Sequence, residues 1–463
     1  MPAIITKDFR IHNAEQFKES FGEAADTYYL AIGRPQAFAD NQAFNDGTDA
    51  SPPTPVDDVG QVEYYAYDDF LSAKKIASTD VSIVIPRRNW ETGTVYDYYR
   101  HDYGDINTAG TAIAADSGAT SLYDATFYAM NSSFDVYKVI DNNGGAASTV
   151  EPSGNKSTSV FTTGDSYKWK YMYSLSASEQ ANFLSTDFMH VSTESTDFST
   201  TAGAIEHVKI TAGGSGGSNG TYTGVDIRGD GTGGKATIVV SSNAVSSVTI
   251  TTAGSGYTFA SVKASDFGSV SNSDIDFIIS PPGGHASDVV TELGGFFVMT
   301  NVDLTQADGS GDFSTGNDFR RIALIRNPTD STTGSTATAS TLDATKSITF
   351  SGTPGSFQAD EKITQATTGA VGFVVDFNST TKVLRYIQPQ FTDQGVDADG
   401  NLTAFASTHT VTGATSSATG TPSSHDTTPE LTHDSGDILY IENRKPISRA
   451  SDQTENVKLI VEF

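Results

Sequence analysis

A glycine-rich run from Gly229 to Lys235 is the first part of the chain whose residue types could do chemistry. It matches the pattern GxxxxGK, with which a phosphate-binding loop holds the phosphates of a nucleotide. Such a loop also needs a Ser or Thr after the lysine to bind magnesium, whereas this chain has Ala236. It needs a following helix as well, whereas residues 237–240 are typical of a strand. We interpret the run as a turn between strands.

Two further patterns resemble reactive or metal-binding loops. Residues 213–217 match GxSxG, the strained turn that presents a hydrolase serine, but they lie in a Gly/Ser run that would not hold a serine in strain. The run from Asp397 to Asn401 begins like a calcium loop, yet Leu402 stands where that loop needs Gly and Thr408 where it needs Glu. We interpret the first as a flexible loop and the second as an Asp-Gly turn.

The histidines and carboxylates give no better site. No two histidines show the HxxxH or HxH spacing of a metal site, and the chain has so many acids that no pair for glycoside cleavage can be selected. We therefore expect no cofactor, no metal and no enzymatic activity. The eight histidines are His12, His101, His190, His207, His285, His409, His425 and His433.

The net charge of the chain limits the kinds of partner that it can bind. The 463 residues include 56 acidic and 28 basic ones, so the formal net charge is -28. A field of this sign repels phosphate backbones and anionic membrane surfaces, so we expect neither nucleic acid nor a membrane as a partner. The chain has no cysteine, which excludes disulfides and thiolate chemistry. Its start lacks the pattern of a signal peptide, so we expect synthesis and assembly in a cytoplasm.

The elements that would position any site are mostly strands. Abundant Gly, Ser and Thr, 43 Gly among them, with only 18% charged residues, are typical of short strands joined by turns. Three segments read as helices: 13–21, 68–77, and one that begins at Ser176 with a capping partner at Glu179. Hydrophobic runs predict strands at 81–85, 134–140, 167–173, 237–240, 348–350, 371–377, 382–387, 438–441 and 457–463.

Two stretches differ in amino-acid composition from the rest of the chain, which is rich in aromatic residues and is called the body below. Residues 207–275 are dominated by Gly, Ser and Thr, and the run 209–216 recurs approximately at 249–257, which indicates a small repeated-strand module. Residues 331–430 begin and end with Ser/Thr-rich tracts, 331–340 and 410–424, which we interpret as linkers around a second module. The expected body is therefore discontinuous and comprises residues 1–206, 276–330 and 431–463.

Three short sequence motifs of this body, called phrases below, resemble motifs that occur in the same order in one protein family. They are Ile85 to Trp90 (IPRRNW), Phe319 to Pro328 (FRRIALIRNP), and Ser435 to Ile447 (SGDILYIENRKPI), the last followed by DQTE at 452–455. The same ordered phrases occur in the baseplate wedge proteins encoded by gene 8 of T-even-like contractile-tailed bacteriophages. Weaker resemblance extends over residues 3–34, 52–90 and 164–173. The resemblance therefore covers the body from the N-terminus to about residue 200 and again after about residue 290, but it does not cover the two modules.

The resemblance implies a mainly β fold, with a β-sandwich body and a few short helices on projecting loops, to which this chain adds two small inserted β modules. It also implies a viral structural protein in the tail baseplate of a virion. Such a protein would pair with itself as a dimer, join other baseplate wedge proteins of the same phage, and take part in baseplate assembly and rearrangement on infection.

The candidate functional residues lie in and around these phrases. Arginine and tryptophan are enriched at interface hot spots, but buried charges must also be paired, so each residue could serve the core or a subunit contact. Both interpretations stay open. The structural or subunit-interface candidates are Arg87, Arg88, Trp90, Arg320, Arg321, Arg326, Glu442, Arg444 and Asp452.

Two other functions remain as alternatives to a structural wedge subunit. One is a tail surface-recognition protein that binds host glycans through its inserted β modules. The other is a tail-borne enzyme that cleaves glycans, for which the sequence offers no specific site.

Overall fold

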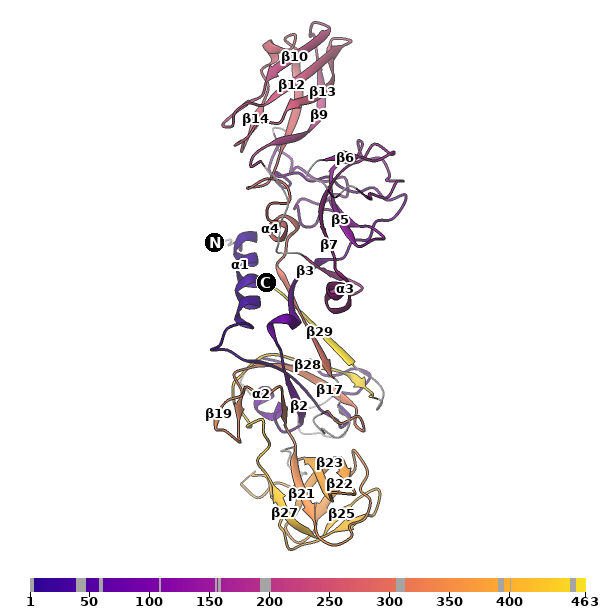
Figure 1. Cartoon of the computed structure of the whole chain (residues 1–463), viewed down its shortest axis with the longest axis vertical. Helices are drawn as coiled ribbons and strands as arrows, with labels where there is room; N and C mark the ends of the chain where they lie inside the picture. The colour runs from indigo at the N-terminus through magenta and orange to yellow at the C-terminus, as the bar shows by residue number, and fades with distance from the viewer. Residues whose placement is uncertain are drawn as a thin grey trace. The chain divides into compact units, whose positions relative to one another are not determined.

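The chain consists mainly of short antiparallel strands (Figure 1), which confirms the expected mainly β class. The chain divides into two compact units. Unit 1 contains Met1–Gln16, Ser82–Met299 and Ile460–Phe463, and unit 2 contains Phe17–Val81 and Thr300–Leu459. The computed structural model describes residues 4–38, 47–57, 61–107, 110–154, 156, 160–191, 201–304, 313–389, 395–399, 401–449 and 455–463.

An aromatic-rich sheet forms the body of unit 1. Its strand order is β4-β5-β7-β6, and Tyr137 on β5 and Trp169 on β7 are fully buried. Alternating aromatic and polar residues suit these strands, because successive side chains point to opposite faces. The strands are β4 (Tyr128–Met130), β5 (Asp135–Asp141), β6 (Phe161–Thr162) and β7 (Lys168–Ser174).

Short helices and further strands complete this body. The strand β3 (Val81–Pro86) pairs antiparallel with β8 (Phe188–His190). The helix α3 (Ala177–Phe183) begins with Ser176 as its cap, and the carboxylate of Glu179 closes the capping box as predicted. The remaining elements are α1 (Lys7–Ser20), α4 (Val289–Leu293), β16 (Phe297–Leu304) and β29 (Glu455–Glu462), of which α1, β16 and β29 have residues in both units.

The first module lies within unit 1 and has its own apolar core. Ile238, Tyr257 and Phe277 are among its buried residues. The strands β9 and β15 pair antiparallel from Ile205 to Ser215 and so bring the start and end of the module together. Its strands are β9 (Ile205–Ser215), β10 (Gly220–Asp226), β11 (Arg228–Gly229), β12 (Lys235–Ser241), β13 (Ala244–Thr252), β14 (Ala260–Ser261) and β15 (Ser271–Ile279).

A five-stranded sheet with the order β20-β2-β1-β17-β28 forms the body of unit 2. Its central strand β1 is buried along its whole length, as expected of a strand with neighbours on both sides. The strand β28 ends the order, so only one of its edges is paired within this sheet. The strands are β1 (Tyr28–Gly33), β2 (Phe70–Lys75), β17 (Phe319–Arg326), β20 (Thr341–Asp343) and β28 (Asp437–Ile447).

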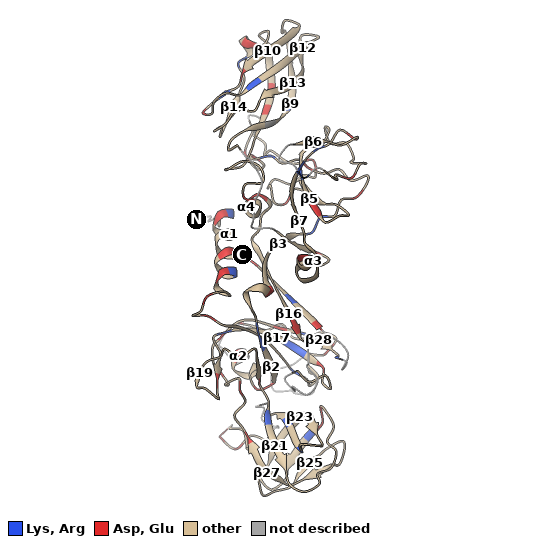
Figure 2. Cartoon of the chain, viewed as in Figure 1, with Lys and Arg blue, Asp and Glu red and all other residues tan. Residues whose placement is uncertain are grey.

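The second module, within unit 2, is a seven-stranded sheet with the order β26-β25-β22-β23-β24-β21-β27. Its core contains Ile348, Val374 and Tyr386. Charged residues are sparse along the ribbon of both modules (Figure 2). The strands are β21 (Lys346–Phe350), β22 (Lys362–Gln365), β23 (Ala370–Asn378), β24 (Val383–Ile387), β25 (Val411–Gly413), β26 (Thr419–Gly420) and β27 (Pro422–Asp426).

Three expectations of local structure were wrong. The segment 68–77 is not a helix, because Phe70–Lys75 forms β2 between β1 and β20, while a helix, α2 (Gln61–Ala66), precedes it. The first helix starts at Lys7, six residues before the predicted cap at Asn13. The Ser/Thr-rich tracts are not linkers, because the first contains β19 (Ser335–Thr336), which pairs with β18 (Thr329–Asp330), and the second contributes β25, β26 and part of β27 to the second module.

Candidate functional site

The two arginines that follow β3 bind backbone carbonyls. Arg87 donates a hydrogen bond from its guanidinium to the carbonyl oxygen of Ser185, at 2.7 Å. Arg88 donates to the carbonyl oxygen of Tyr123 at 3.2 Å and stands over the ring of Tyr128, 4.5 Å from its centre. Both side chains are half-buried. Here the guanidinium donors satisfy loop carbonyls that have no strand partner, which stabilises a corner of unit 1.

Trp90 extends the same corner. Its indole nitrogen donates to the hydroxyl of Ser148 at 3.1 Å, and its backbone N–H donates to the carbonyl oxygen of Met130 at 2.8 Å. The hydroxyl of Ser148 in turn donates to the carboxylate of Asp165 at 3.0 Å. The first phrase is thus held by hydrogen bonds to four neighbouring loops or strands, those of Tyr123, Met130, Ser148 and Ser185.

The second phrase places a buried arginine, Arg320, and a half-buried one, Arg321, on β17. Arg320 binds Asp49 with two parallel hydrogen bonds of 2.9 Å, and these bonds hold the pKa of Asp49 below its ordinary value. Arg321 donates to both oxygens of Asp69, at 2.8 and 2.9 Å, and to the amide oxygen of Asn443 at 3.0 Å. Burial raises the pKa of Asp69, and the charge of Arg321 acts against that increase.

The remaining described candidates are more exposed. Arg326, at the end of β17, pairs with Asp437 at 2.7 Å, and both side chains are largely in solvent. On β28, Glu442 accepts a hydrogen bond from the hydroxyl of Tyr440 at 2.9 Å and lies 3.4 Å from the guanidinium of Arg444. Because Ile322 of β17 pairs with Glu442, the second and third phrases form neighbouring strands of one sheet.

The candidates therefore do not form a single site. Arg87, Arg88 and Trp90 lie in unit 1, whereas the described candidates of the second and third phrases lie in unit 2. Asp452 lies outside the described residues. The buried arginines bind groups of this chain, and the exposed charges of β17 and β28 are accessible to a partner.

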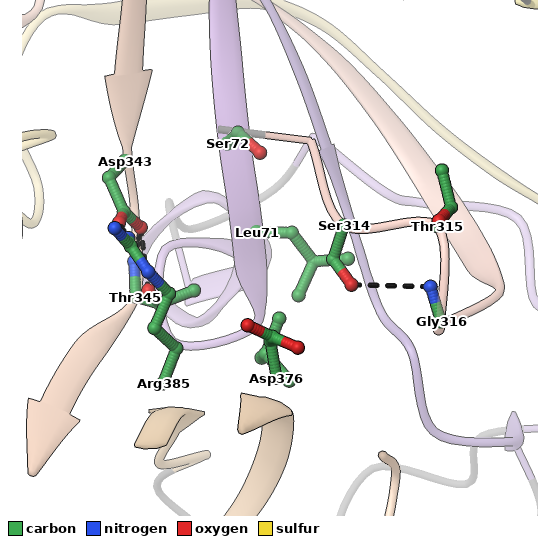
Figure 3. A pocket seen from close by; sticks show the side chains of 10 residues that line it. Leu71, Ser72, Ser314, Thr315, Gly316, Asp343, Thr345, Asp376 and Arg385 are labelled. Carbon is green, nitrogen blue, oxygen red and sulfur yellow. Dashed lines mark hydrogen bonds and ion pairs between the residues drawn. The ribbon is translucent and has the colours of Figure 1, made fainter. Parts of the chain in front are cut away.

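A polar cavity of about 120 Å³ lies in unit 2 (Figure 3). Asp343, at the end of β20, forms an ion pair with Arg385 of β24 and accepts hydrogen bonds from the backbone N–H and hydroxyl of Thr345, at 2.7 and 2.6 Å. This carboxylate is fully engaged, which argues against a role as an acid or base. Leu71, Ser72, Ser314, Thr315, Gly316, Asp343, Thr345, Val375, Asp376 and Arg385 line the cavity.

A second cavity in unit 2 has about twice that volume, about 250 Å³. No sequence pattern indicated this cavity, because most of its walls come from segments far apart in the chain, near residues 64–68, 344–346, 386–388 and 427–433. Tyr64, Tyr67, Asp68, Ala344, Lys346, Tyr386, Ile387, Gln388, Leu402, Thr427, Pro429, Leu431 and His433 line it.

The glycines of the GxxxxGK run have a structural explanation. They pack around the buried ring of Tyr257: a Cβ atom on Gly231 would lie 2.4 Å from the ring, and one on Gly234 would lie 2.8 Å from the hydroxyl. The hydroxyl donates to the carbonyl oxygen of Ile227 at 3.0 Å and accepts from the N–H of Gly234 at 3.1 Å. The run is followed by the strand β12, as predicted.

The other motif-like segments have comparably simple surroundings. The carboxylate of Asp397 accepts hydrogen bonds from the backbone N–H groups of Asp399 and Asn401, each at 2.9 Å, as in a turn closed by an aspartate. Across the described ranges, no group of three or more His, Asp and Glu side chains could hold a metal ion. Within the same ranges, no helix is long and apolar enough to cross a membrane.

Comparison with known proteins finds a family match that includes the first of the three phrases. Residues 3–143 match the family model described as Bacteriophage T4, Gp8. The baseplate wedge protein gp8 of Enterobacteria phage T4 is 25% identical over 206 residues, which cover 41% of this chain and 60% of that protein. The chain thus spans less than two thirds of the length of this relative. The predicted resemblance to the gene 8 family is confirmed.

Proposed function

We propose that this chain is a structural subunit of the baseplate in a contractile phage tail, where it joins neighbouring wedge subunits. The observation that carries the proposal is the match of residues 3–143 to the Gp8 family, which includes the corner built by Arg87, Arg88 and Trp90. A virion component assembled in the host cytoplasm follows from this role, as does participation in rearrangement of the baseplate on infection. The role is non-enzymatic.

The two modules, near residues 207–275 and 331–430, are additions to a host body in this proposal. Each has its own apolar core, which supports the idea that it folds around itself. Long insertions in surface loops carry only a small entropic cost, so a host fold can accept them. Loss of the first module, or of the β21–β27 sheet of the second, would then spare assembly of the wedge, whereas β20 pairs with β2 of the body.

The partners are a second copy of the chain and other wedge proteins. The edge of β28 supports a self-contact. This strand lies at the end of its sheet and bears Leu439, whose side chain is 44% exposed. It begins with Asp437 and carries Arg444 and Lys445 near its other end, so antiparallel pairing of two copies would bring opposite charges together.

Assembly is the test of the wedge role. We expect the purified chain to scatter light as a dimer and to enter a stable complex when it is co-expressed with the adjacent wedge proteins of the same phage. A chain that stays monomeric and also enters no such complex would overturn the proposal. A variant that lacks the first module, residues 205–279, should assemble as the full chain does.

A substitution separates the self-contact from the wedge contact. Leu439→Asp adds a charge to the exposed edge and should convert the dimer to a monomer in light scattering, because the edge could no longer pair without burying that charge. Val95→Asp is the matched control, since Val95 is 42% exposed but lies in unit 1. A dimer that survives Leu439→Asp would exclude β28 as the self-contact.

A further inference from the structure

The larger cavity of unit 2 has an aromatic wall. Tyr64 and Tyr67, from α2 and the turn that follows it, stand against His433, with ring centres 4.6 and 5.5 Å from the imidazole. The imidazole Nε2 lies 3.0 Å from the carboxylate of Asp68, which fixes the ring. The hydroxyl of Tyr67 donates to the carbonyl oxygen of Ser435 at 2.6 Å, which holds that ring as well.

The other wall is polar and comes from the second module. Lys346 and Tyr386 lie directly opposite each other on β21 and β24, and Gln388 follows two residues after Tyr386. Side chains at such positions share a face. The ammonium of Lys346 donates to the amide oxygen of Gln388 at 3.1 Å, and the amide nitrogen of Gln388 donates to the carbonyl oxygen of Thr403 at 2.7 Å.

One group in this wall is unsatisfied. The hydroxyl of Tyr386 is buried and has no hydrogen-bond partner among the described residues. Leaving a buried hydroxyl unpaired costs about 1–3 kcal/mol. Because the ring is 0% exposed and belongs to the module core, a ligand in the cavity would have to displace the ring slightly to supply a partner and recover that stability. A ring of the same kind without a hydroxyl would have filled the module core equally well.

We propose that this cavity binds a pyranose unit of a carbohydrate. Aromatic rings pack against the apolar C–H face of such a ring. Its hydroxyls need donors and acceptors side by side, and the cavity offers an ammonium, an amide and a carboxylate-bound imidazole, with the buried hydroxyl of Tyr386 behind them. The volume of about 250 Å³ lies below the roughly 300–1,000 Å³ of sites for drug-sized ligands, as one sugar ring requires.

The charges favour a neutral ring over an anionic ligand. Burial lowers the pKa of Lys346, and the negative charge of Asp68 acts against this effect. The two charges offset each other within the cavity, and the chain as a whole carries a net charge of -28, which repels anions. The proposal is independent of the wedge role, because a chain that assembles normally can either bind sugar or fail to bind it.

Saturation-transfer difference NMR on the full chain tests the proposal, with glucose, galactose, mannose and N-acetylglucosamine as separate probes at millimolar concentration. We expect ring-proton signals from at least one of them. Lys346→Met should weaken the affinity for that sugar about tenfold, because a hydrogen bond from a charged donor is lost. The absence of ring-proton signals from all four sugars would overturn the proposal.

Tyr386→Phe is the sharpest variant, since it removes only the unpaired hydroxyl. Thermal unfolding of unit 2 should be unchanged or slightly later, while affinity for the sugar falls severalfold. Tyr137→Phe is the matched control, because the hydroxyl of Tyr137 is likewise buried without a partner among the described residues but lies in unit 1. It should change neither property. Sugar binding that is equally strong in the wild type, Lys346→Met and Tyr386→Phe would place the ligand elsewhere and overturn the assignment.

Discussion

Lys138 and Glu292 form an ion pair inside unit 1, where their side chains are 0% and 2% exposed. Lys138 lies on the central strand β5 and Glu292 on the short helix α4. The other carboxylate oxygen of Glu292 accepts a hydrogen bond from the N–H of Ala286 at 2.6 Å, and the imidazole of His285 lies 3.2 Å from the carboxylate. The loop before α4 is thereby attached to the sheet by charge as well as by packing.

Breaking this pair should strongly destabilise unit 1. Glu292→Gln keeps the shape of the side chain but removes the negative charge that pairs with the buried ammonium of Lys138, so we expect a loss of about 3–5 kcal/mol in the free energy of unfolding. Denaturant unfolding monitored by tryptophan fluorescence measures it. The control is Lys235→Gln, because Lys235 pairs with Asp226 in the same unit and the two side chains are 43% and 60% exposed, and exposed pairs contribute little. Equal losses in both variants would show that burial does not decide the effect.

His285 should make the stability of unit 1 sensitive to acid. Burial, together with the nearby charges of Lys138 and Lys170, holds the pKa of His285 well below its ordinary value. The unfolded chain therefore binds a proton on this histidine at a higher pH than the folded chain does. Stability is complete above the unfolded pKa of about 6.5 and falls as the pH decreases, by up to about 1.4 kcal/mol per pH unit for one group.

Removing the histidine provides the measurement for this pH effect. His285→Asn cannot take up the proton, so the dependence of its unfolding free energy on pH between about 6.5 and 5 should be shallower than that of the wild type by up to one proton. His12→Asn is the control, since His12 is exposed on α1. A wild-type slope retained in His285→Asn would contradict the assignment.

Short sequence patterns predicted correctly those elements that depend only on neighbouring residues. Ser176 and Glu179 define the start of α3 because the capping box involves only neighbouring residues. The segment Phe70–Lys75 was misread as a helix because its strand conformation depends on pairing with β1 and β20, which are distant in the chain. The Ser/Thr-rich tracts were misread as linkers because strands can also form from small polar residues when a sheet supplies the partners.

The same distinction between neighbouring residues and distant ones applies to the candidate functional residues. The phrases around Arg87 and Arg321 could be recognised because they are contiguous. That Arg321 binds Asp69, 252 positions away, depends on the order of strands and could not be read from composition or spacing. The cavity lined by Tyr64 and Lys346 escaped prediction for the same reason.

The packing of glycine around Tyr257 predicts which residues stabilise the first module. Gly231→Ala would place a methyl group 2.4 Å from the Tyr257 ring, and such overpacking costs about 1–3 kcal/mol. Gly220→Ala is the matched control, because its Cβ would meet only ordinary contacts with Tyr222. We expect hydrogen exchange of the β12 amides to accelerate in the first variant and to stay unchanged in the second. Equal exchange in both would mean that the ring can move aside.

Arg321 and Arg326 lie on the same strand, and substituting each in turn compares a largely buried ion pair with an exposed one. Arg321→Lys keeps the charge but loses the fork that contacts Asp69 and Asn443 together, so we expect unit 2 to lose about 2–4 kcal/mol in unfolding free energy. Arg326→Lys changes a pair that is mostly in solvent, and should leave that free energy near the wild-type value. If Arg326 instead serves a subunit contact, its substitution should weaken dimerisation while Arg321→Lys lowers the melting temperature. Calorimetry and light scattering on both variants distinguish these roles, and a melting temperature that falls equally in both would contradict the separation.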